Sequence, residues 1–300
     1  MSTFSVWISA MRLRTLPLSV SGIILASCLA HYKGVFSWSV CILAILTTLS
    51  FQILSNFAND YGDGVKGTDN AERIGPERAI QSGKITPKQL FKAIKLNIVI
   101  ALLLAITLIY VAFGTNYLLL SSLFLVLGVA SIIAAMKYTV GDNAYGYRAM
   151  GDIFVFIFFG LVSVLGCYTL FAKSLDFIPV LPACTVGLLS MGVLNLNNMR
   201  DRVSDEKVNK ITLAVKLGAQ KAKIYHFALI ITALSLAIIF GVVFYKNALN
   251  LIFLIAFIPL LIHLKTVVKN KEPKLLDPEL KKVALTTVLL AILMGVGQLL

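Results

Sequence analysis

The sequence predicts an all-α polytopic membrane protein, a bundle of about nine transmembrane helices around a cytoplasm-facing cavity. Three observations lead to this fold class. The mean hydropathy is +0.88, and only 14% of the 300 residues are charged, values outside the range of ordinary soluble domains. Apolar runs of about 20 residues, the length that crosses a bilayer, recur along the whole chain. No alternating pattern suggests a barrel, so helices must satisfy the backbone in lipid.

The expected spans cover nearly all of the chain. We place them at roughly 15–32, 37–58, 93–113, 117–136, 153–172, 177–197, 223–244, 248–264 and 283–299. The longest polar stretch between them runs from about 59 to 92, which is too short for a separate soluble domain. Residues 1–300 are therefore predicted to form one membrane-embedded domain.

The distribution of charge predicts the orientation. The net charge of +13 would suggest nucleic acid as a partner of a soluble protein, but here the positions of the basic residues give another reason. With alternating spans, 24 of the 27 Lys and Arg fall on one side, and only Lys33, Lys173 and Lys246 on the other. Loops rich in Lys and Arg stay in the cytoplasm. We therefore expect the N-terminus in the cytoplasm, the C-terminus outside and no nucleic-acid partner.

A first acidic cluster follows the second span. At 100° per residue its polar side chains lie within about 100° of one another, so they form one stripe at the wet, cytoplasmic end of an apolar helix. The stripe consists of Asn56, Asn59, Asp60 and Asp63. Gly62, Gly64 and Gly67 are expected to loosen the chain beyond it, and Asp69 to return from a loop.

A second acidic cluster follows the sixth span, and its polar residues also share a helix face, within about 120°. They are Asn195, Asn198, Asp201 and Asp205. Two such stripes facing each other would form a metal site in the core of a bundle. Hard oxygen ligands without neighbouring His or Cys favour Mg²⁺, which often shares its coordination shell with phosphate.

Two other readings of these clusters stay open. The acids could solvate helix ends and pair with Lys66, Arg200 and Arg202. The chain could also be a cation-coupled transporter, although transport sites usually lie near the membrane midplane on broken helices. The four cysteines lack metal-ligand spacing, and the three histidines stand apart from one another in sequence, so both sets are expected to be structural.

Five stretches of the chain resemble the UbiA-type membrane prenyltransferases, most closely the branch that acts on 1,4-dihydroxy-2-naphthoate. They span nearly the whole sequence and are Trp7-x-x-Ala10-Met-Arg12-Leu-Arg14-Thr15-Leu16-Pro17-Leu18-Ser19; Asn59-Asp60-Tyr61-Gly-Asp63-Gly-Val-Lys66-Gly67-Thr-Asp69; Arg73-Ile-Gly75-Pro76-Glu-Arg78 with Gln81-Ser82-Gly83; Lys137-Tyr138-Thr139 with Tyr145-Gly146-Tyr147 and Phe156-Ile-Phe158-Phe159-Gly160; and Asn198-Met-Arg200-Asp201-x-x-x-Asp205, continuing into Lys210-x-Thr212-Leu213-Ala214. The third acid is Asp69, as in the naphthoate branch, rather than the residue at Gly67.

The resemblance implies a reaction and a location. A polyprenyl diphosphate would donate its prenyl group to 1,4-dihydroxy-2-naphthoate, which would lose its carboxyl group as CO₂ and give demethylmenaquinone. Another aromatic acid, such as 4-hydroxybenzoate, is the alternative acceptor. The enzyme would lie in the bacterial cytoplasmic (inner) membrane, with its prenyl substrate between helices that open to lipid. Neither the chain length of the donor nor the oligomeric state follows from the residues.

The proposed roles follow from the chemistry of a departing diphosphate, whose charge a metal must neutralise. Asp60 and Asp63 are assigned to one Mg²⁺ and Asp201 and Asp205 to a second, with Asp69 as a further metal residue. Basic side chains assigned to diphosphate are Lys66, Arg73, Arg78, Arg200, Arg202 and Lys207. The catalytic set that would orient the acceptor is Asn56, Asn59, Tyr138 and Asn198. Aromatic residues expected to shield an allylic cation are Phe57, Tyr61, Tyr138, Tyr145 and Tyr147.

Overall fold

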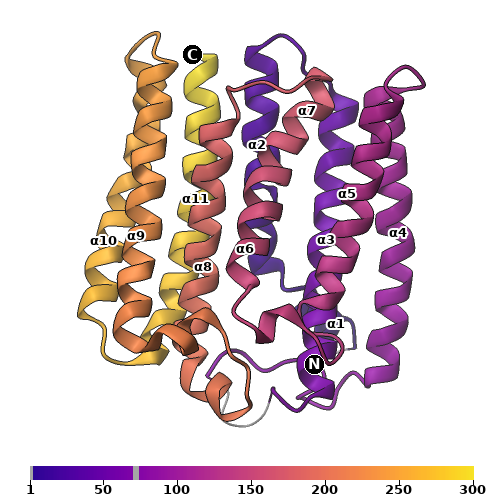
Figure 1. The fold of residues 1–300 in the computed structure, drawn as a ribbon, viewed down its shortest axis with the longest axis vertical. Helices are drawn as coiled ribbons and strands as arrows, with labels where there is room; N and C mark the ends of the chain where they lie inside the picture. The colour runs from indigo at the N-terminus through magenta and orange to yellow at the C-terminus, as the bar shows by residue number, and fades with distance from the viewer. Residues whose placement is uncertain (1–2, 70–73) are drawn as a thin grey trace.

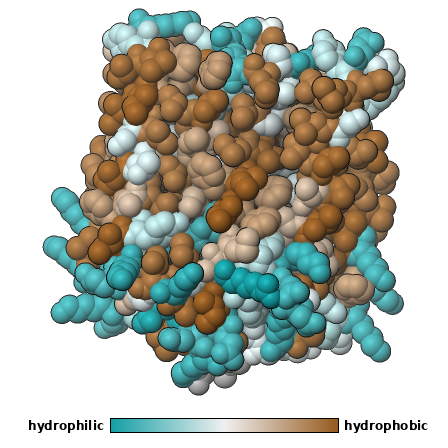
Figure 2. Space-filling view, in the orientation of Figure 1, coloured by the Kyte–Doolittle hydropathy of each residue, from teal (hydrophilic) through white to brown (hydrophobic). Residues whose placement is uncertain are grey.

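The structure, a computed structural model, describes residues 3–69 and 74–300. It is an upright bundle of helices with the N-terminus at one end and the C-terminus at the other (Figure 1). On the face shown in Figure 2, apolar side chains cover the middle of the bundle, and hydrophilic side chains gather most densely at the end where the N-terminus lies. In the described ranges the one pairing of extended backbone is an isolated bridge between Arg148 and Ile211. The predicted fold class is confirmed.

Eight helical spans in the described residues are long and apolar enough to cross a membrane. They are α3 (Trp38–Val65), α4 (Pro87–Phe113), α5 (Leu118–Lys137), the run α6 (Gly151–Val155), η3 (Phe156–Gly166) and α7 (Cys167–Ala172), α8 (Val180–Lys207), α9 (Leu213–Val243), the pair η4 (Ala248–Ala256) and α10 (Phe257–Lys269), and the pair η5 (Pro273–Leu276) and α11 (Asp277–Leu299). A ninth requires α1 (Thr3–Met11) and α2 (Leu16–Tyr32) together, which bend by 52° across η1 (Leu13–Thr15).

Local sequence signals explain where α4 begins and ends. Thr86 caps its N-terminus in a capping box with Gln89, and Pro87 occupies the first turn, where a missing N–H costs nothing. Gly114 follows the last turn with a φ of +58°, a conformation that side chains other than glycine rarely adopt. The apolar sequence between these signals therefore forms one uninterrupted helix.

The helices that carry the acidic clusters extend past the predicted spans. Helix α3 continues to Val65 and α8 to Lys207, so Gly62 and Gly64 do not loosen the chain as expected. They lie inside α3 because neighbouring segments pack on them. A Cβ atom at Gly62 would lie 2.7 Å from the backbone carbon of Thr139. Both acidic stripes are consequently held on rigid helices.

Two of the histidines are not isolated, contrary to the sequence expectation. The Nε2 atoms of His226 and His263 lie 2.7 Å apart, and His263 Nδ1 is 2.5 Å from Glu279 Oε2. Glu279 also pairs with Lys282. Their spacing in sequence concealed this contact, because α9, α10 and α11 bring the residues together only when they pack. The cluster therefore joins these three helices by polar contacts. In an apolar region such contacts help helices to associate.

The span formed by α6, η3 and α7 packs closely on α8. Its middle part, η3, is wound as a π-helix over 11 residues, a rare geometry that often occurs at functional sites. Gly160 faces Gly187 at this crossing, and a Cβ at Gly160 would lie 2.7 Å from the carbonyl oxygen of Ala183. Small residues permit this approach, as they commonly do between membrane helices.

Substitution of Gly160 tests whether this crossing stabilises the fold. Gly160→Ala is expected to lower the free energy of unfolding by about 1–3 kcal/mol, because overpacking forces rigid backbone apart. Gly128→Ala is the matched control: its nearest neighbour, the Cβ of Ala105, would be 3.8 Å away, so the change should be neutral or stabilise by up to about 1 kcal/mol. Thermal unfolding in detergent measures both. Equal melting temperatures for the two variants would contradict the packing argument.

Candidate active site

The two acidic clusters meet at the end of the bundle that carries the N-terminus, here called the polar end. Lys210 joins them: its Nζ lies 3.1 Å from Asp63 Oδ2 on α3 and 3.9 Å from Asp205 Oδ1 on α8. The two carboxylates are therefore no farther apart than the sum of these distances. Lys210 was quoted in a sequence motif but was not among the predicted site residues, since its proximity to Asp63 arises only in the folded chain.

Tyr147 forms the other side of this cluster. Its hydroxyl donates to Asp63 Oδ1 at 2.7 Å and lies 2.6 Å from Thr68 Oγ1. The Nζ atoms of Lys66 and Lys210 lie over the Tyr147 ring, 4.1 and 5.4 Å from its centroid. Burial and the charge of Asp63 raise the pKa of Tyr147, so the phenol keeps its proton and remains a donor. Asp69 lies in the turn after α3, where its N–H donates to the carbonyl of Asp63.

Asp60 pairs with two arginines from outside α3. The guanidinium of Arg12 donates to Asp60 Oδ1, and Arg78 Nε lies 3.7 Å from the same oxygen. Arg12 has a φ of 53°, a strained conformation for a side-chain-bearing residue, and its Nε is buried without a hydrogen-bond partner. Asp60, Arg12 and Arg78 line a cavity of about 310 Å³ at the polar end.

The carboxylate of Asp201 is bound by the neighbouring Arg200. Arg200 Nε and Nη2 donate to Asp201 at 2.8 and 2.7 Å. Nη2 also donates to Asn197 on α8, and Nη1 donates to Asp277 on α11. The Arg200 side chain is only 2% exposed. Its guanidinium therefore fixes α8 to α11 in this structure, in addition to any role toward a ligand.

The acids are buried rather than placed at wet helix ends, which corrects the sequence expectation. Asp60 is 1%, Asp201 3% and Asp205 6% exposed. The reason is that α3 and α8 continue beyond the predicted spans and the connecting segments cover them. Each of these carboxylates has a basic neighbour, as buried charges require.

The predicted diphosphate residues occupy different positions. Lys66 and Arg78 lie in the acidic cluster, where Lys66 also donates to the carbonyl of Gly141 at 2.8 Å. Arg202 pairs with Glu206 at 3.8 Å along the outer face of α8, and Lys207 is exposed at the end of that helix. Arg73 lies outside the described residues.

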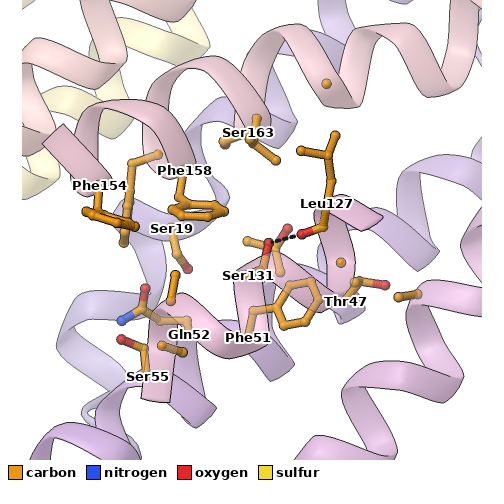
Figure 3. Close-up of a pocket in the computed structure, with 18 of the residues that line it drawn as sticks. Ser19, Thr47, Phe51, Gln52, Ser55, Leu127, Ser131, Phe154, Phe158 and Ser163 are labelled. Atoms are coloured by element: carbon orange, nitrogen blue, oxygen red, sulfur yellow. Dashed lines mark hydrogen bonds between the residues drawn. The ribbon is translucent and has the colours of Figure 1, made fainter. Parts of the chain in front are cut away.

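A large apolar cavity of about 320 Å³ begins beside the acidic clusters and continues into the membrane region. It is lined by α2, α3, α4, α5, the α6–η3–α7 span and one residue of α8 (Figure 3). On α3 the lining runs from Asn59 back to Ala44, which is about 22 Å along a helix at 1.5 Å per residue. The cavity therefore extends over most of the roughly 30 Å of hydrocarbon.

Helix α3 carries the largest share of the polar groups in this cavity. Asn59 lines it, and the Oδ1 of Asn59 is buried without a hydrogen-bond partner. Gln52, Ser55 and Ser19 also face the space (Figure 3). Asn56 does not line it.

The amide of Asn56 bonds instead to Met11, Thr15 and Gln52 and so fixes α3 to the N-terminal segment. Asn198 is buried on α8 and is likewise absent from the described lining. Of the predicted catalytic set, the structure places Asn59 and Tyr138 at the cavity.

Aromatic rings form one wall of the cavity. Tyr138 packs edge-on against Tyr145 with centroids 5.3 Å apart, Tyr145 stacks on Phe154 at 3.9 Å, and Phe154 is followed by Phe158 at 6.3 Å. The predicted Phe57 and Tyr61 pack elsewhere, against Trp7 and Phe91. Phe51 and Phe154 were missed, because aromatic residues inside apolar spans carry no signal of which way they face.

The carboxylate and amide oxygens at the polar end suit a divalent cation whose coordination shell also includes atoms of a bound ligand. Among the described residues no three His, Cys, Asp or Glu side chains form a preformed metal cage. Mg²⁺ seldom uses such cages and commonly binds one or two carboxylates together with phosphate. Asp63 and Asp205 already share the ammonium group of Lys210. On the same face of α3, Asn59 Oδ1 has no hydrogen-bond partner and could coordinate a metal.

The chain is similar in sequence to several known enzymes. The chain is 41% identical over 297 residues to the 1,4-dihydroxy-2-naphthoate octaprenyltransferase of Haemophilus influenzae, covering 98% of this chain and 95% of that one. It is 41% identical over 291 residues to the Escherichia coli enzyme of the same name, covering 96% and 94%. The Mycobacterium tuberculosis enzyme of that name is 34% identical, covering 78% and 77%.

Solved structures share the fold at low sequence identity. A UbiA homolog from Aeropyrum pernix superposes with a TM-score of 0.66 at 14% identity, covering 97% of this chain and 96% of that one. One from Archaeoglobus fulgidus bound to GPP and Mg²⁺ superposes with a TM-score of 0.64 at 13% identity, covering 95% and 99%. The model of the UbiA prenyltransferase family matches residues 20–295. The chain belongs to the UbiA prenyltransferase family.

Proposed function

We propose that this protein transfers a polyprenyl group from a polyprenyl diphosphate to 1,4-dihydroxy-2-naphthoate, with loss of the carboxyl group, in menaquinone biosynthesis. The observation that carries the proposal is the long apolar cavity that begins beside a cluster of buried carboxylates and cations. An apolar channel of this kind suits an isoprenoid chain, and the charged end suits its diphosphate. The names of the relatives that are 41% identical support the acceptor.

We propose Mg²⁺ as the cofactor: Asp60 and Asp63 on α3 would hold one ion and Asp201 and Asp205 on α8 a second, with Asp69 as a further metal residue. When bound there, the ions would neutralise the charge that builds up on the departing diphosphate. The A. fulgidus homolog with GPP and Mg²⁺ supports this assignment. Basic residues at the polar end, Lys66 and Arg78 among them, would carry the remaining charge by hydrogen bonds to phosphate oxygens.

In the reaction, the bond between C1 of the prenyl chain and a diphosphate oxygen breaks, and its electron pair leaves with the diphosphate. The ring carbon that bears the carboxylate supplies the pair for the new C–C bond to C1. As CO₂ departs, the pair of its former bond returns to the ring. The product is the reduced form of demethylmenaquinone, and no other reactant is needed.

The cavity residues stabilise the charge that develops during this exchange. The ring faces of Tyr138, Tyr145 and Phe154 can stabilise positive charge on C1, and the apolar lining excludes water that would capture the allylic cation. Asn59, whose Oδ1 has no partner, can accept a hydrogen bond from a hydroxyl of the acceptor or bind the metal. Tyr138, which also lines the cavity, can donate a hydrogen bond to the acceptor.

We propose that residues 1–300 form one domain in the bacterial inner membrane, with the polar end in the cytoplasm and the C-terminus outside. The charge distribution supports this orientation, since 24 of the 27 Lys and Arg fall on the side of the predicted spans that we assign to the cytoplasm. Reporter fusions within 199–222 should report a cytoplasmic location, and fusions after Leu300 an external one. Fusions that place 199–222 outside would contradict both the orientation and access of a cytoplasmic diphosphate to the site.

Substitution of the carboxylates tests the metal assignment. Asp60→Asn and Asp201→Asn should each lower turnover by about 10² or more, because these side chains act on charge that develops in the transition state. Both residues are buried in ion pairs, so activity must be measured per folded molecule, together with thermal stability.

Asp176→Asn is the control for these variants. Asp176 pairs with Lys33 at 3.8 Å in the segment between α7 and α8, away from the polar end, and its replacement should leave turnover nearly unchanged. Wild-type specific activity in correctly folded Asp60→Asn would contradict the assignment and favour a purely structural ion pair.

A panel of acceptors separates the proposed reaction from its alternatives. Purified protein given Mg²⁺, a long prenyl diphosphate and either 1,4-dihydroxy-2-naphthoate or 4-hydroxybenzoate should prenylate the naphthoate at least about tenfold faster, with release of one CO₂. Such selectivity requires about 1.4 kcal/mol of differential transition-state binding. Mass spectrometry identifies the product. A preference for 4-hydroxybenzoate would replace the acceptor, and no product with either acid would leave the transporter reading.

A further inference from the structure

Lys210 is held in place by its backbone as well as by its side chain. It follows α8 in a short turn in which Asn209 has a φ of +56° and the N–H of Lys210 donates to the carbonyl of Asp205 at 2.8 Å. The next residue, Ile211, pairs with Arg148, which adjoins Tyr147. This turn directs the Lys210 ammonium between α3 and α8, where it contacts both acidic clusters.

The ammonium stands between two carboxylates that would otherwise repel each other. The side chains of Asp63 and Asp205 are only 13% and 9% exposed, and that of Lys210 is 14% exposed. The Nζ of Lys210 lies within ion-pair distance of both carboxylates. Lys210 therefore offers a fixed positive charge to both acids, although one cation compensates only one of the two negative charges.

We propose that Lys210 is an exchangeable counter-ion of the active site. Without a divalent cation it keeps Asp63 and Asp205 together. When a divalent cation binds, Lys210 leaves the carboxylates, and when diphosphate follows, Lys210 pairs with a diphosphate oxygen. The identity of the diphosphate rests on the proposed function, whereas the exchange of one cation for another does not. Lys210 is in this sense a positioning residue for the carboxylates.

Electrostatics explains why the exchange proceeds in this direction. A divalent cation compensates both carboxylates at once, and it repels an ammonium at the same position. Asp63 Oδ2 is the oxygen that Lys210 occupies, while Tyr147 holds Oδ1, so departure of Lys210 frees one oxygen of a carboxylate that stays oriented. The flexible lysine stem permits the movement without a change in the backbone.

The first experiment measures binding of Mn²⁺, a paramagnetic substitute for Mg²⁺, by electron paramagnetic resonance of the free ion. Lys210→Met should bind Mn²⁺ about tenfold more tightly than wild type, because the Lys210 ammonium no longer competes for Asp63 and Asp205. In the presence of Mn²⁺, the same variant should bind inorganic pyrophosphate about tenfold more weakly, because one of its partners is lost. These opposite changes are not expected of a lysine that only stabilises the fold.

Two further variants are the controls. Lys95→Met removes the same charge from an exposed position on α4, where the Lys95 ammonium lies over the Phe91 ring, and should change neither affinity. Lys210→Arg keeps the positive charge and should restore Mn²⁺ affinity to near the wild-type value. If Mn²⁺ affinity in folded Lys210→Met equals or falls below that of wild type, the proposal is wrong.

A second experiment uses the unchanged protein and so does not depend on how a variant folds. An amine-specific reagent is applied and labelling of Lys210 is measured by mass spectrometry, with Lys95 as the internal reference. Labelling of Lys210 should rise when Mg²⁺ is added and fall again when pyrophosphate follows. Labelling that stays constant through both additions overturns the exchange.

Failure of the proposed function gives a different pattern. If wild type binds Mn²⁺ and exchanges Lys210 but makes no prenylated product, the cation exchange stands and the reaction is misassigned. If wild type makes the product while Lys210 labelling never changes, the reaction stands and the exchange is excluded.

Discussion

The need of buried carboxylates for positive charge determines how the polar end of this protein is built. Asp60 pairs with Arg12 and Arg78, Asp201 pairs with Arg200, and Asp63 and Asp205 share Lys210. Arg12, Arg78 and Lys210 lie outside the helices that carry their acidic partners, whereas Arg200 adjoins Asp201 on α8 and also pairs with Asp277 on α11. Because an unpaired charge in a largely apolar bundle is very costly, these pairs fix the packing of the N-terminal segment, α3, α8 and the turn after α8.

That arrangement also positions the site for chemistry. Lys210 holds Asp63 and Asp205 close together, and Asn59, next to Asp60 on α3, lines the apolar cavity together with Tyr138. The cations that stabilise the site without ligand are themselves suitable partners for diphosphate. The same basic residues can thus pair with the acids when no ligand is bound and with diphosphate when substrate binds. The exchange proposed for Lys210 is one example.

Close packing sets the shape of the cavity. Gly160 and Gly187 let η3 approach α8. The π-helical segment η3 forms part of the cavity wall, to which it contributes Phe158 and Ser163. Figure 3 shows Phe154 and Phe158 on one side of the space and Phe51 on another. A prenyl chain in this space would contact aromatic rings and aliphatic groups. Few polar groups or waters would be near enough to react with the cationic carbon C1.

The sequence by itself determined the helical membrane fold, the two polar stripes and the concentration of charge at one end, because hydropathy and helical period are properties of neighbouring residues. It also indicated Asn59 and Tyr138. The tertiary structure decided what pairs with what: Lys210 reaches Asp63 across 147 positions, Asn56 binds the N-terminal segment, and α3 stays helical through Gly62 and Gly64. Such contacts depend on how the helices pack, and hydropathy contains no record of which residues of separate helices become neighbours.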